Sequence, residues 1–361
     1  MRKLFQIVEY NDGRNNACGK APTDVRKILE SMGANDLEYS KPAKKTTNRL
    51  LARIFARINK EWYGMLQFYK FFCKVERRSL LLLQYPNQLL KHQERIFLMC
   101  VRRLKAVKTV VLIHDIPNHE NMHVVSDIVA PNDFKKEMAA FDRIIVHNAI
   151  MKKWFCDSGI GCGRLVNLTI FDYLITDDEF DLEYTPFLRQ VVVAGNLSID
   201  KAGYLEKLKD IKDVRWELFG GPYDESKCCG DNVHYRGSHL PMDLPKLLKS
   251  GFGLVWDGPS VCACEGGWGA YLRINNPHKM SLYLAAGIPV ITWKEAAQAQ
   301  FIVQNKVGFV VDNLYEIGER LKSMSEEEYN MYRGNAVRQA YKLRKGWYTI
   351  RAISKCEEEE V

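Results

Sequence analysis

The chain has 361 residues, of which 47% are apolar and 27% are charged, with 24 Gly and 12 Pro. This composition excludes a disordered, collagen-like or fibrous protein, and the length predicts two domains with separate cores. The net charge of +8 is uneven, because residues 1–110 hold 23 Lys and Arg against 9 Asp and Glu and the remainder is net negative by 6. The basic half attracts anionic partners such as a phosphate backbone or an anionic membrane.

Short apolar runs of the β type alternate with helical stretches along the whole chain. In the first half we expect strands at 4–9, 80–85, 109–114 and 143–147, and helices near 23–32, 46–62, 88–106 and 133–140. In the second half we expect strands at 190–194, 215–219, 233–235, 252–256, 289–293 and 308–311. The alternation predicts an α/β protein with two doubly wound, Rossmann-like domains on parallel sheets.

An acidic, loop-like stretch over residues 176–186 separates the two series of strands. We therefore predict an N-terminal domain over 1–172, a linker over 173–188 and a C-terminal domain over 189–345. Ligands of open parallel sheets bind beyond the carboxyl ends of the strands. Two such domains that face each other would enclose a ligand cleft.

The segment after the first strand is rich in small polar residues and precedes a helix expected to open at Pro22. It lacks the Gly-Lys-Ser/Thr sequence of a P-loop. Asn15, Asn16 and Gly19 are candidates for lining the cleft on its acceptor side.

A cationic stripe follows in the same half, where Lys45, Arg49, Arg53 and Arg57 recur every four residues. This spacing predicts one amphipathic helix, either with a solvated basic face or in contact with an anionic membrane surface. Nucleic acid is not an expected partner, since no RNP, zinc-finger or KH pattern accompanies the charge.

His114 and Asp115 end the expected strand 109–114, at the mouth of the cleft. A general base must act there, and either side chain could be that base. Each could equally be a strand-end residue that caps a loop.

The most informative stretch of the second half is Asn275-Asn276-Pro277-His278-Lys279. Asn276 can cap a helix that has Pro277 at its first position, and this helix would carry Lys279 in its first turn. Free backbone N–H groups beside a cation suit a diphosphate, although Asn276 could simply cap and Lys279 simply face water. Gly195-Asn196 and Phe219-Gly220 follow two strands, where glycine lets the backbone approach a ligand.

Metal and disulfide chemistry are not expected. The chain contains no Asp-x-Asp, so the charge of a departing diphosphate would be met by Lys279, Lys201 or Arg273. Its ten cysteines include no Cys-x-x-Cys pair, which predicts neither a zinc site nor a disulfide framework. With a charged start and no apolar run near the roughly 20 residues of a membrane span, we expect a reduced, cytoplasmic protein.

Several motifs together resemble the bacterial β-1,6-galactofuranosyltransferases of O-antigen and capsule clusters, and more distantly the streptococcal adhesin glucosyltransferases. These motifs are Ile-His-Asp-Ile over 113–116, Ile-Phe-Asp-Tyr-Leu over 170–174, Ala-Gly-Asn-Leu-Ser over 194–198, Gly-Leu-Val-Trp-Asp-Gly over 253–258, Asn-Asn-Pro-His-Lys over 275–279 and Gly-Ile-Pro-Val over 287–290. The resemblance extends from about residue 108 to the C-terminus.

The resemblance implies a GT-B fold, in which a final helix over 346–361 returns to the N-terminal domain. It implies a UDP-sugar held mainly by the C-terminal domain, with no metal or other cofactor. The predicted donor site comprises Gly195, Asn196, Lys201, Phe219, Gly220, Tyr235, Asp257, Tyr271, Asn275, Asn276, Lys279 and Ser281.

We therefore expect an inverting, metal-independent transferase that moves a hexose, foremost galactofuranose, from UDP to a free or lipid-linked glycan acceptor. Asp115 or His114 would deprotonate the acceptor hydroxyl. The enzyme would build a surface polysaccharide in the cytoplasm, peripheral to the inner membrane face, as a homo-oligomer. The alternatives are a UDP-glucose or UDP-N-acetylglucosamine transferase, a non-catalytic nucleotide-sugar-binding partner of another transferase, and a nucleic-acid-binding protein.

Overall fold

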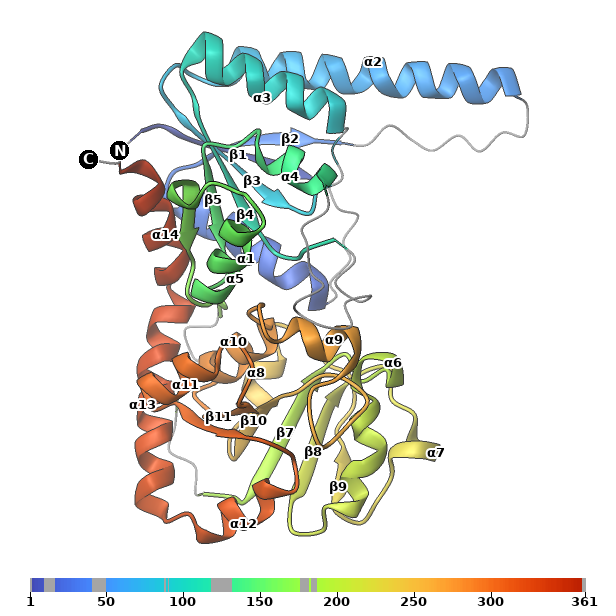
Figure 1. Cartoon of the computed structure of the whole chain (residues 1–361), viewed down its shortest axis with the longest axis vertical. Coiled ribbons are helices and arrows are strands. Elements are labelled where there is room, and N and C mark those ends of the chain that lie inside the picture. Colours follow the sequence, from blue (N-terminus) through green and yellow to red (C-terminus); the bar gives the residue numbers. More distant parts are fainter. Residues whose placement is uncertain are drawn as a thin grey trace.

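Two six-stranded parallel sheets form the molecule, one in each half of the chain, as Figure 1 shows for the computed structural model. The structure describes residues 2–9, 17–40, 50–87, 89, 91–117, 132–175, 182 and 187–358. The strand order is β2-β1-β3-β4-β5-β6 in the first sheet and β12-β11-β10-β7-β8-β9 in the second. Both orders reverse direction beside the first strand of the domain, as in a doubly wound fold.

The N-terminal domain follows the expected alternation of strands and helices. Its strands are β1 (Leu4–Glu9), β2 (Asn35–Tyr39), β3 (Leu80–Tyr85), β4 (Lys108–Ile113), β5 (Arg143–Val146) and β6 (Leu165–Asn167). Its helices are α1 (Ala17–Ser31), α2 (Leu50–Lys74), α3 (Lys91–Lys105), α4 (Asn132–Met138) and α5 (Ala149–Asp157), with a short 3-10 turn at Cys162–Arg164.

The C-terminal domain has shorter helices between its strands. Its strands are β7 (Gln190–Gly195), β8 (Arg215–Gly220), β9 (Val233–Tyr235), β10 (Phe252–Val255), β11 (Val290–Trp293) and β12 (Gly308–Val311). Its helices are α6 (Ile199–Ala202), a 3-10 helix at Gly203–Asp210, α7 (Glu225–Cys228), α8 (Leu244–Leu247), α9 (Gly266–Tyr271), α10 (His278–Ala285), α11 (Ala299–Asn305), α12 (Glu316–Ser323) and α13 (Glu326–Arg344).

The final helix, α14 (Trp347–Glu357), packs against α1 and β6 of the N-terminal domain, so the expected return of the C-terminus is confirmed (Figure 1). The carboxylate of Asp172 accepts hydrogen bonds from the backbone N–H groups of Tyr348 (3.2 Å) and Thr349 (2.7 Å). These donors belong to the first turn of α14, where the helix itself supplies no acceptor. Asp172 therefore caps α14 from a distant part of the chain.

The ten expected strands are all present, and two edge strands, β2 and β6, were not predicted. Asn35, Asp36 and Glu38 give β2 a polar character, and β6 has three residues, so neither shows a strong strand pattern. Helix α1 begins at Ala17, so the expected start at Pro22 is wrong. Pro22 lies within the helix, where its missing N–H removes a single bond near the N-terminal end.

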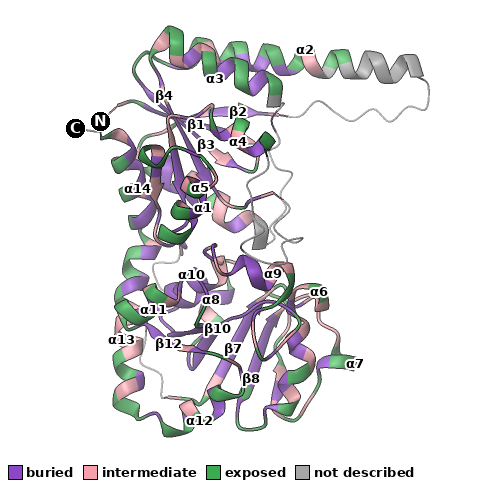
Figure 2. Cartoon of the chain, in the orientation of Figure 1, coloured by how far each residue is buried: buried purple, intermediate pink, exposed green. Residues whose placement is uncertain are grey.

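The core is continuous between the domains. Strand residues such as Leu81, Val111 and Val192 are buried, which explains the near-unbroken apolar runs in the sequence, and Figure 2 shows the central strands of both sheets as largely buried. Phe171 and Tyr271 are buried members of apolar clusters that span both domains. Packing across the junction therefore fixes how the two sheets face each other.

Several predictions fall where the structure gives little or no description. Asn15, Asn16, Lys45 and Arg49 lie outside the described residues. Two further stripe residues, at positions 53 and 57, belong to α2, but their side chains are not described. In the described part of the chain, no helix is long and apolar enough to span a membrane.

The expectation of uniformly free thiols is wrong at one pair. Cys156, at the end of α5, and Cys162, in the following turn, are joined by a disulfide, with their Cα atoms 5.2 Å apart. The turn between them brings the two residues within bonding range, which a spacing of six residues does not signal in a sequence.

Candidate active site at the domain junction

Asp115 and His114 follow β4 at the junction, as predicted, but their environments differ. The backbone N–H of Ile116 donates to the hydroxyl of Tyr271 (3.2 Å), and this hydroxyl also hydrogen-bonds the Asp115 side chain. Asp115 is exposed, whereas Tyr271 is buried and comes from the C-terminal domain. The two domains thus position one carboxylate together while leaving it open to solvent.

His114 is held as a neutral ring. Its Nε2 lies 2.6 Å from Oε1 of Gln84, and its ring stacks on Phe171 at 5.4 Å. Burial lowers the pKa of His114 to about 3, and the nearby His147 and His278 lower it further. The His114 ring is thus held by Gln84 and Phe171, whereas the Asp115 carboxylate is exposed and open to an acceptor hydroxyl.

His147 uses both ring nitrogens, one within the N-terminal domain and the other toward the C-terminal domain. Its Nε2 lies 3.1 Å from the carbonyl of Ile113, and its Nδ1 accepts from the backbone N–H of Asn276 (2.9 Å). These contacts define a neutral tautomer, in agreement with burial that lowers the pKa of His147 to about 4. The sequence did not single out this histidine.

Asn276 serves the same junction, so its expected role as a helix cap is wrong. Its Nδ2 donates to the carbonyls of His147 (2.7 Å) and Thr169 (3.1 Å), and its Oδ1 accepts from Asn148 (2.7 Å). Helix α10 starts at His278, with Pro277 at the cap position and no side-chain cap. The amide of Asn276 is therefore engaged by the opposite domain.

Ser281 and Asn275 lie on either side of Asn276 and differ in whether their side chains are hydrogen-bonded. The Ser281 hydroxyl donates to the carbonyl of Phe171 (2.7 Å) in a buried position, which gives it a packing role. Oδ1 of Asn275 and Nε2 of His278 are buried and have no hydrogen-bond partner among the described residues. Buried polar atoms are normally paired, so these two atoms suit a ligand group at the start of α10.

Lys279, on the first turn of α10, forms a largely buried ion pair. Its Nζ lies 2.8 Å from Oδ1 of Asp257 and donates to the carbonyl of Trp256 (3.0 Å), and 14% of its side chain is exposed. Burial lowers the pKa of Lys279, Asp257 raises it, and the neighbouring Lys201 lowers it. Two ammonium groups therefore approach each other at the carboxyl ends of β7 and β10.

Lys201 belongs to the same group of strand-end loops. Its carbonyl accepts from the backbone N–H of Gly258 (2.8 Å), and its Nζ lies 4.5 Å from the centre of the Trp268 ring. Asn196 is exposed nearby, with its Oδ1 bonded to the N–H of Ser198 (2.9 Å). The predicted residues Asn196, Lys201, Asp257 and Lys279 thus belong to adjacent loops.

The predicted glycines are required by the backbone itself. Gly195 and Gly220 have φ values of +121° and +134°, and a Cβ on Gly220 would lie 1.9 Å from the carbonyl oxygen of Gly195. Tyr235 donates its hydroxyl to the carbonyl of Gly220 (2.9 Å) and stacks on Tyr223 at 4.3 Å, while Phe219 is buried. Phe219, Gly220 and Tyr235 thus lie together at the ends of β8 and β9.

Lys20 and Asp24 form a buried ion pair that was not among the predicted site residues. Lys20 donates to the carbonyl of Leu174 (2.8 Å), Asp24 accepts from its N–H (3.0 Å), and the ammonium lies 4.3 Å from the Tyr173 ring centre. The spacing of four on α1 is the signal that could have revealed the pair. Gly19 precedes it on the same helix.

No group of three metal-ligating side chains occurs within the described ranges.

Comparisons with known proteins agree with this architecture. Family models for the glucosyltransferase 3-like N-terminal and C-terminal domains match residues 5–170 and 191–356. The β-1,6-galactofuranosyltransferase WbbI of Escherichia coli (strain K12) is 35% identical over 280 residues, covering 77% of this chain and 79% of that protein. Glucosyltransferase 3 of Streptococcus gordonii is 26% identical over 345 residues, covering 92% of each chain.

Solved structures show the same fold. An E. coli trehalose-6-phosphate structure bound with UDP-2-fluoro glucose gives a TM-score of 0.60 at 11% identity, covering 99% of both chains. The apo lipopolysaccharide outer core galactosyltransferase WaaB gives 0.60 at 10% identity, covering 98% of both chains. Together with the two parallel sheets, these likenesses confirm the expected GT-B fold.

Proposed function

The chain belongs to the glucosyltransferase 3-like family and is a glycosyltransferase, and we propose that it transfers galactofuranose from UDP-galactofuranose to a glycan acceptor. The choice of sugar rests on the similarity to the E. coli galactofuranosyltransferase, which shares 35% of its residues over most of this chain. The product would contribute to a surface polysaccharide.

The proposal rests mainly on two cationic side chains, Lys201 and Lys279, near the carboxyl ends of β7 and β10. Lys201 lies near enough to Lys279 to lower the pKa of that ammonium, and burial lowers it as well. A diphosphate between the two would raise the pKa of Lys279, because it supplies negative charge where two positive charges lie close together. The same cations would stabilise departing UDP, and transfer would not require a metal ion.

Asp115 would act as the base in a single displacement. As the acceptor oxygen bonds to the anomeric carbon, its proton passes to the Asp115 carboxylate and the bond from that carbon to the UDP oxygen breaks with its electron pair. Attack from the face opposite UDP inverts the anomeric centre. The exposure of Asp115 and its hydrogen bond to Tyr271 support this role.

Calorimetric titration of the purified chain with UDP in EDTA tests the donor site. We expect saturable UDP binding, with GDP and ADP at least tenfold weaker. Product analysis with UDP-galactofuranose, UDP-galactopyranose and UDP-glucose then tests the sugar. Selective UDP binding without galactofuranose transfer would reject the proposed donor, and no UDP binding would reject the site.

A second candidate is glucosyl transfer, favoured by the similarity to Glucosyltransferase 3 of S. gordonii over 92% of the chain. Product formed from UDP-glucose alone would select it. UDP binding with no product from any donor would favour the non-catalytic alternative. A homo-oligomer, a lipid-linked acceptor and a cytoplasmic location stay predictions.

A further inference from the structure

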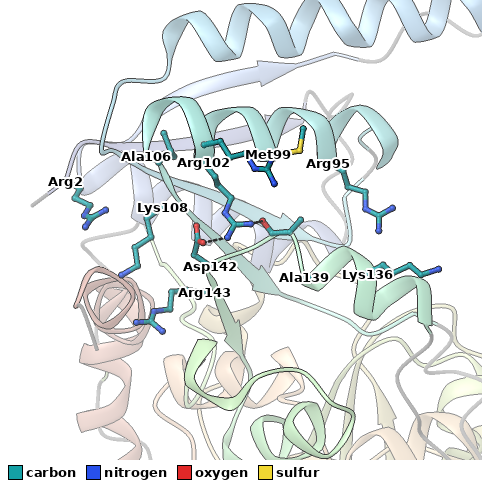
Figure 3. A pocket seen from close by; sticks show the side chains of 13 residues that line it. Arg2, Arg95, Met99, Arg102, Ala106, Lys108, Lys136, Ala139, Asp142 and Arg143 are labelled. Carbon is teal, nitrogen blue, oxygen red and sulfur yellow. Dashed lines mark hydrogen bonds and ion pairs between the residues drawn. The ribbon is translucent and has the colours of Figure 1, made fainter. Parts of the chain in front are cut away.

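Asp115 follows β4 at its carboxyl end, whereas a cavity of about 860 Å³ lies at the other end of this strand. The cavity is formed by α3, α4 and the first residues of β4 and β5, among them Lys108 (Figure 3). A strand rises about 3.3 Å per residue, so the six residues of β4 span roughly 20 Å. The cavity is therefore too distant to position the Asp115 carboxylate, which depends on the domain junction.

The backbone on both sides of Asp115 is held by hydrogen bonds. The N–H of His114 donates to the carbonyl of Tyr85 at the end of β3 (2.7 Å), and the N–H of Ile116 donates to the hydroxyl of Tyr271 (3.2 Å). The Ile116 side chain is buried, whereas Asp115, between the two anchored residues, is exposed. The carboxylate thus reaches solvent from a fixed stretch of backbone.

Tyr271 ends α9 of the C-terminal domain, yet its ring lies in the apolar core of the N-terminal domain. It belongs to a buried cluster whose other members, apart from Ile274, all come from residues 5–165. Close packing around a buried ring holds it in one orientation. The hydroxyl of Tyr271 is therefore directed at the segment that carries Asp115.

The hydroxyl of Tyr271 is suited to donate to a carboxylate. A tyrosine hydroxyl has one proton to donate and lone pairs that accept, and here it accepts from Ile116 and also hydrogen-bonds the Asp115 side chain. An ionised carboxylate can only accept, so the proton of this second bond belongs to Tyr271. Burial raises the pKa of Tyr271 well above its ordinary value, and Asp115 raises it further, which keeps the hydroxyl protonated at neutral pH.

Helix α9 also contacts the proposed donor site. A Cβ on Gly269 would lie 3.0 Å from the carbonyl oxygen of Asp257, so α9 packs directly on the loop that carries the ion-pair partner of Lys279. The ring centre of Trp268, on the same helix, lies 4.5 Å from Nζ of Lys201. One short helix therefore connects the two cations proposed to bind UDP with the candidate base.

We propose that Tyr271 is a positioning residue that orients the Asp115 carboxylate for proton transfer from the acceptor hydroxyl. An exposed carboxylate otherwise samples several rotamers, and a donated hydrogen bond holds it in one of them. Because Tyr271 belongs to the domain proposed to bind UDP, the base is in position only when the two domains are docked against each other. This inference rests on the proposed function, in which Asp115 is the base.

Steady-state kinetics of Tyr271→Phe test the proposal, because phenylalanine keeps the ring and removes only the hydroxyl. We expect kcat to fall about 10- to 150-fold, the range for a hydrogen bond to a charged group, while the KM for the donor and the Kd for UDP stay unchanged. The acid limb of the kcat profile should move to higher pH by roughly one unit, because the lost hydrogen bond favours the ionised carboxylate. The adjacent His114 ring is engaged by Gln84 and Phe171.

Replacement of Tyr271 by 3-fluorotyrosine is a second variant, which keeps the hydroxyl and makes it a stronger donor. It should move the acid limb to lower pH, and it tests the proposal even where Tyr271→Phe does not fold. In the Asp115→Asn background, Tyr271→Phe should lower the remaining activity by less than about threefold, because the positioned group no longer accepts a proton.

The matched control is Tyr329→Phe, in another buried tyrosine of the C-terminal domain whose hydroxyl accepts from a backbone N–H, that of Gly251 (3.2 Å). This variant should lower stability to a similar degree and leave kcat and its acid limb unchanged. Melting curves verify that the compared proteins are folded.

Unaltered kcat and acid limb in Tyr271→Phe, with Asp115→Asn inactive, would overturn the positioning role and leave the proposed function in place. An equal loss with Asp115 and with Asn at that position would assign Tyr271 to packing alone and would also overturn it. Normal transfer by Asp115→Asn would reject Asp115 as the base, and the inference with it.

Discussion

Asp115 and His114 are adjacent in sequence, yet the structure gives them different surroundings: Asp115 is exposed, whereas the His114 ring contacts Gln84 and Phe171. We expect Asp115→Asn to lower transfer by about 10²- to 10⁴-fold, since an amide cannot accept the acceptor proton. UDP affinity should stay unchanged, because Asp115 belongs to the N-terminal domain and the proposed UDP site to the C-terminal domain. Steady-state assays with UDP calorimetry check both expectations.

His114→Gln is the companion variant. It should retain more activity than Asp115→Asn, because the His114 ring is held by Gln84 and stacked on Phe171, whereas Asp115 is exposed. Loss of activity in this variant with normal activity in Asp115→Asn would reverse the assignment of the base.

Lys279 should contribute most of the cationic binding of UDP. A hydrogen bond to a charged group contributes about 1.5–3 kcal/mol, so Lys279→Ala should raise the Kd for UDP by about 10- to 150-fold. Lys279→Arg, which keeps a cation beside Asp257, should bind within about tenfold of the unaltered chain. Lys294→Ala is the control, since Lys294 pairs with Asp312 on the surface. Melting curves verify folding, and unchanged affinity in Lys279→Ala would contradict the site.

At the scale of elements, alanine substitutions at two glycines should change the free energy of unfolding in opposite directions. A Cβ on Gly253 of β10 would lie 2.1 Å from the ring of the buried Tyr283 on α10, whereas one on Gly334 of α13 would meet nothing within 4 Å. Gly253→Ala should lower the free energy of unfolding by about 1–3 kcal/mol through overpacking. Gly334→Ala should raise it by about 0.5–1 kcal/mol through helix propensity. Chemical denaturation measures both, and equal effects would contradict the packing of α10 on β10.

At the scale of the whole molecule, Asp172 couples α14 to the N-terminal domain and should make stability depend on pH. Burial raises the pKa of this carboxyl from 3.8 to about 7, against the opposing effect of its hydrogen bonds. Between pH 4 and 7 the folded chain keeps a proton that the unfolded chain has released. The free energy of unfolding should therefore fall as pH rises through this window.

Asp172→Asn removes this titration and keeps an oxygen to accept from the first turn of α14. Denaturation midpoints at pH 4, 5, 6 and 7 should decline less steeply in the variant than in the unaltered chain. Asp210→Asn, an exposed carboxylate, should leave the slope unchanged. Identical slopes in all three proteins would show that Asp172 does not titrate in this range.

The sequence by itself determined the architecture. Ten of the twelve strands could be predicted, because strands buried on both faces of a parallel sheet are continuous apolar runs. The strand-end positions of Asp115 and Gly195 followed from the same pattern, since the end of an apolar run marks where the chain leaves the sheet. The polar edge strand β2 lacked that signal.

The tertiary structure alone decided which of these residues are available to a ligand. Asn276 has a good capping sequence, but His147 and Thr169 from the opposite domain take its amide. The low pKa of His114, the cap that Asp172 gives to α14 and the ion pair of Lys279 with Asp257 likewise depend on groups distant in the chain. Burial and hydrogen bonding are set by whichever segments pack together, and the local residue pattern does not contain that information.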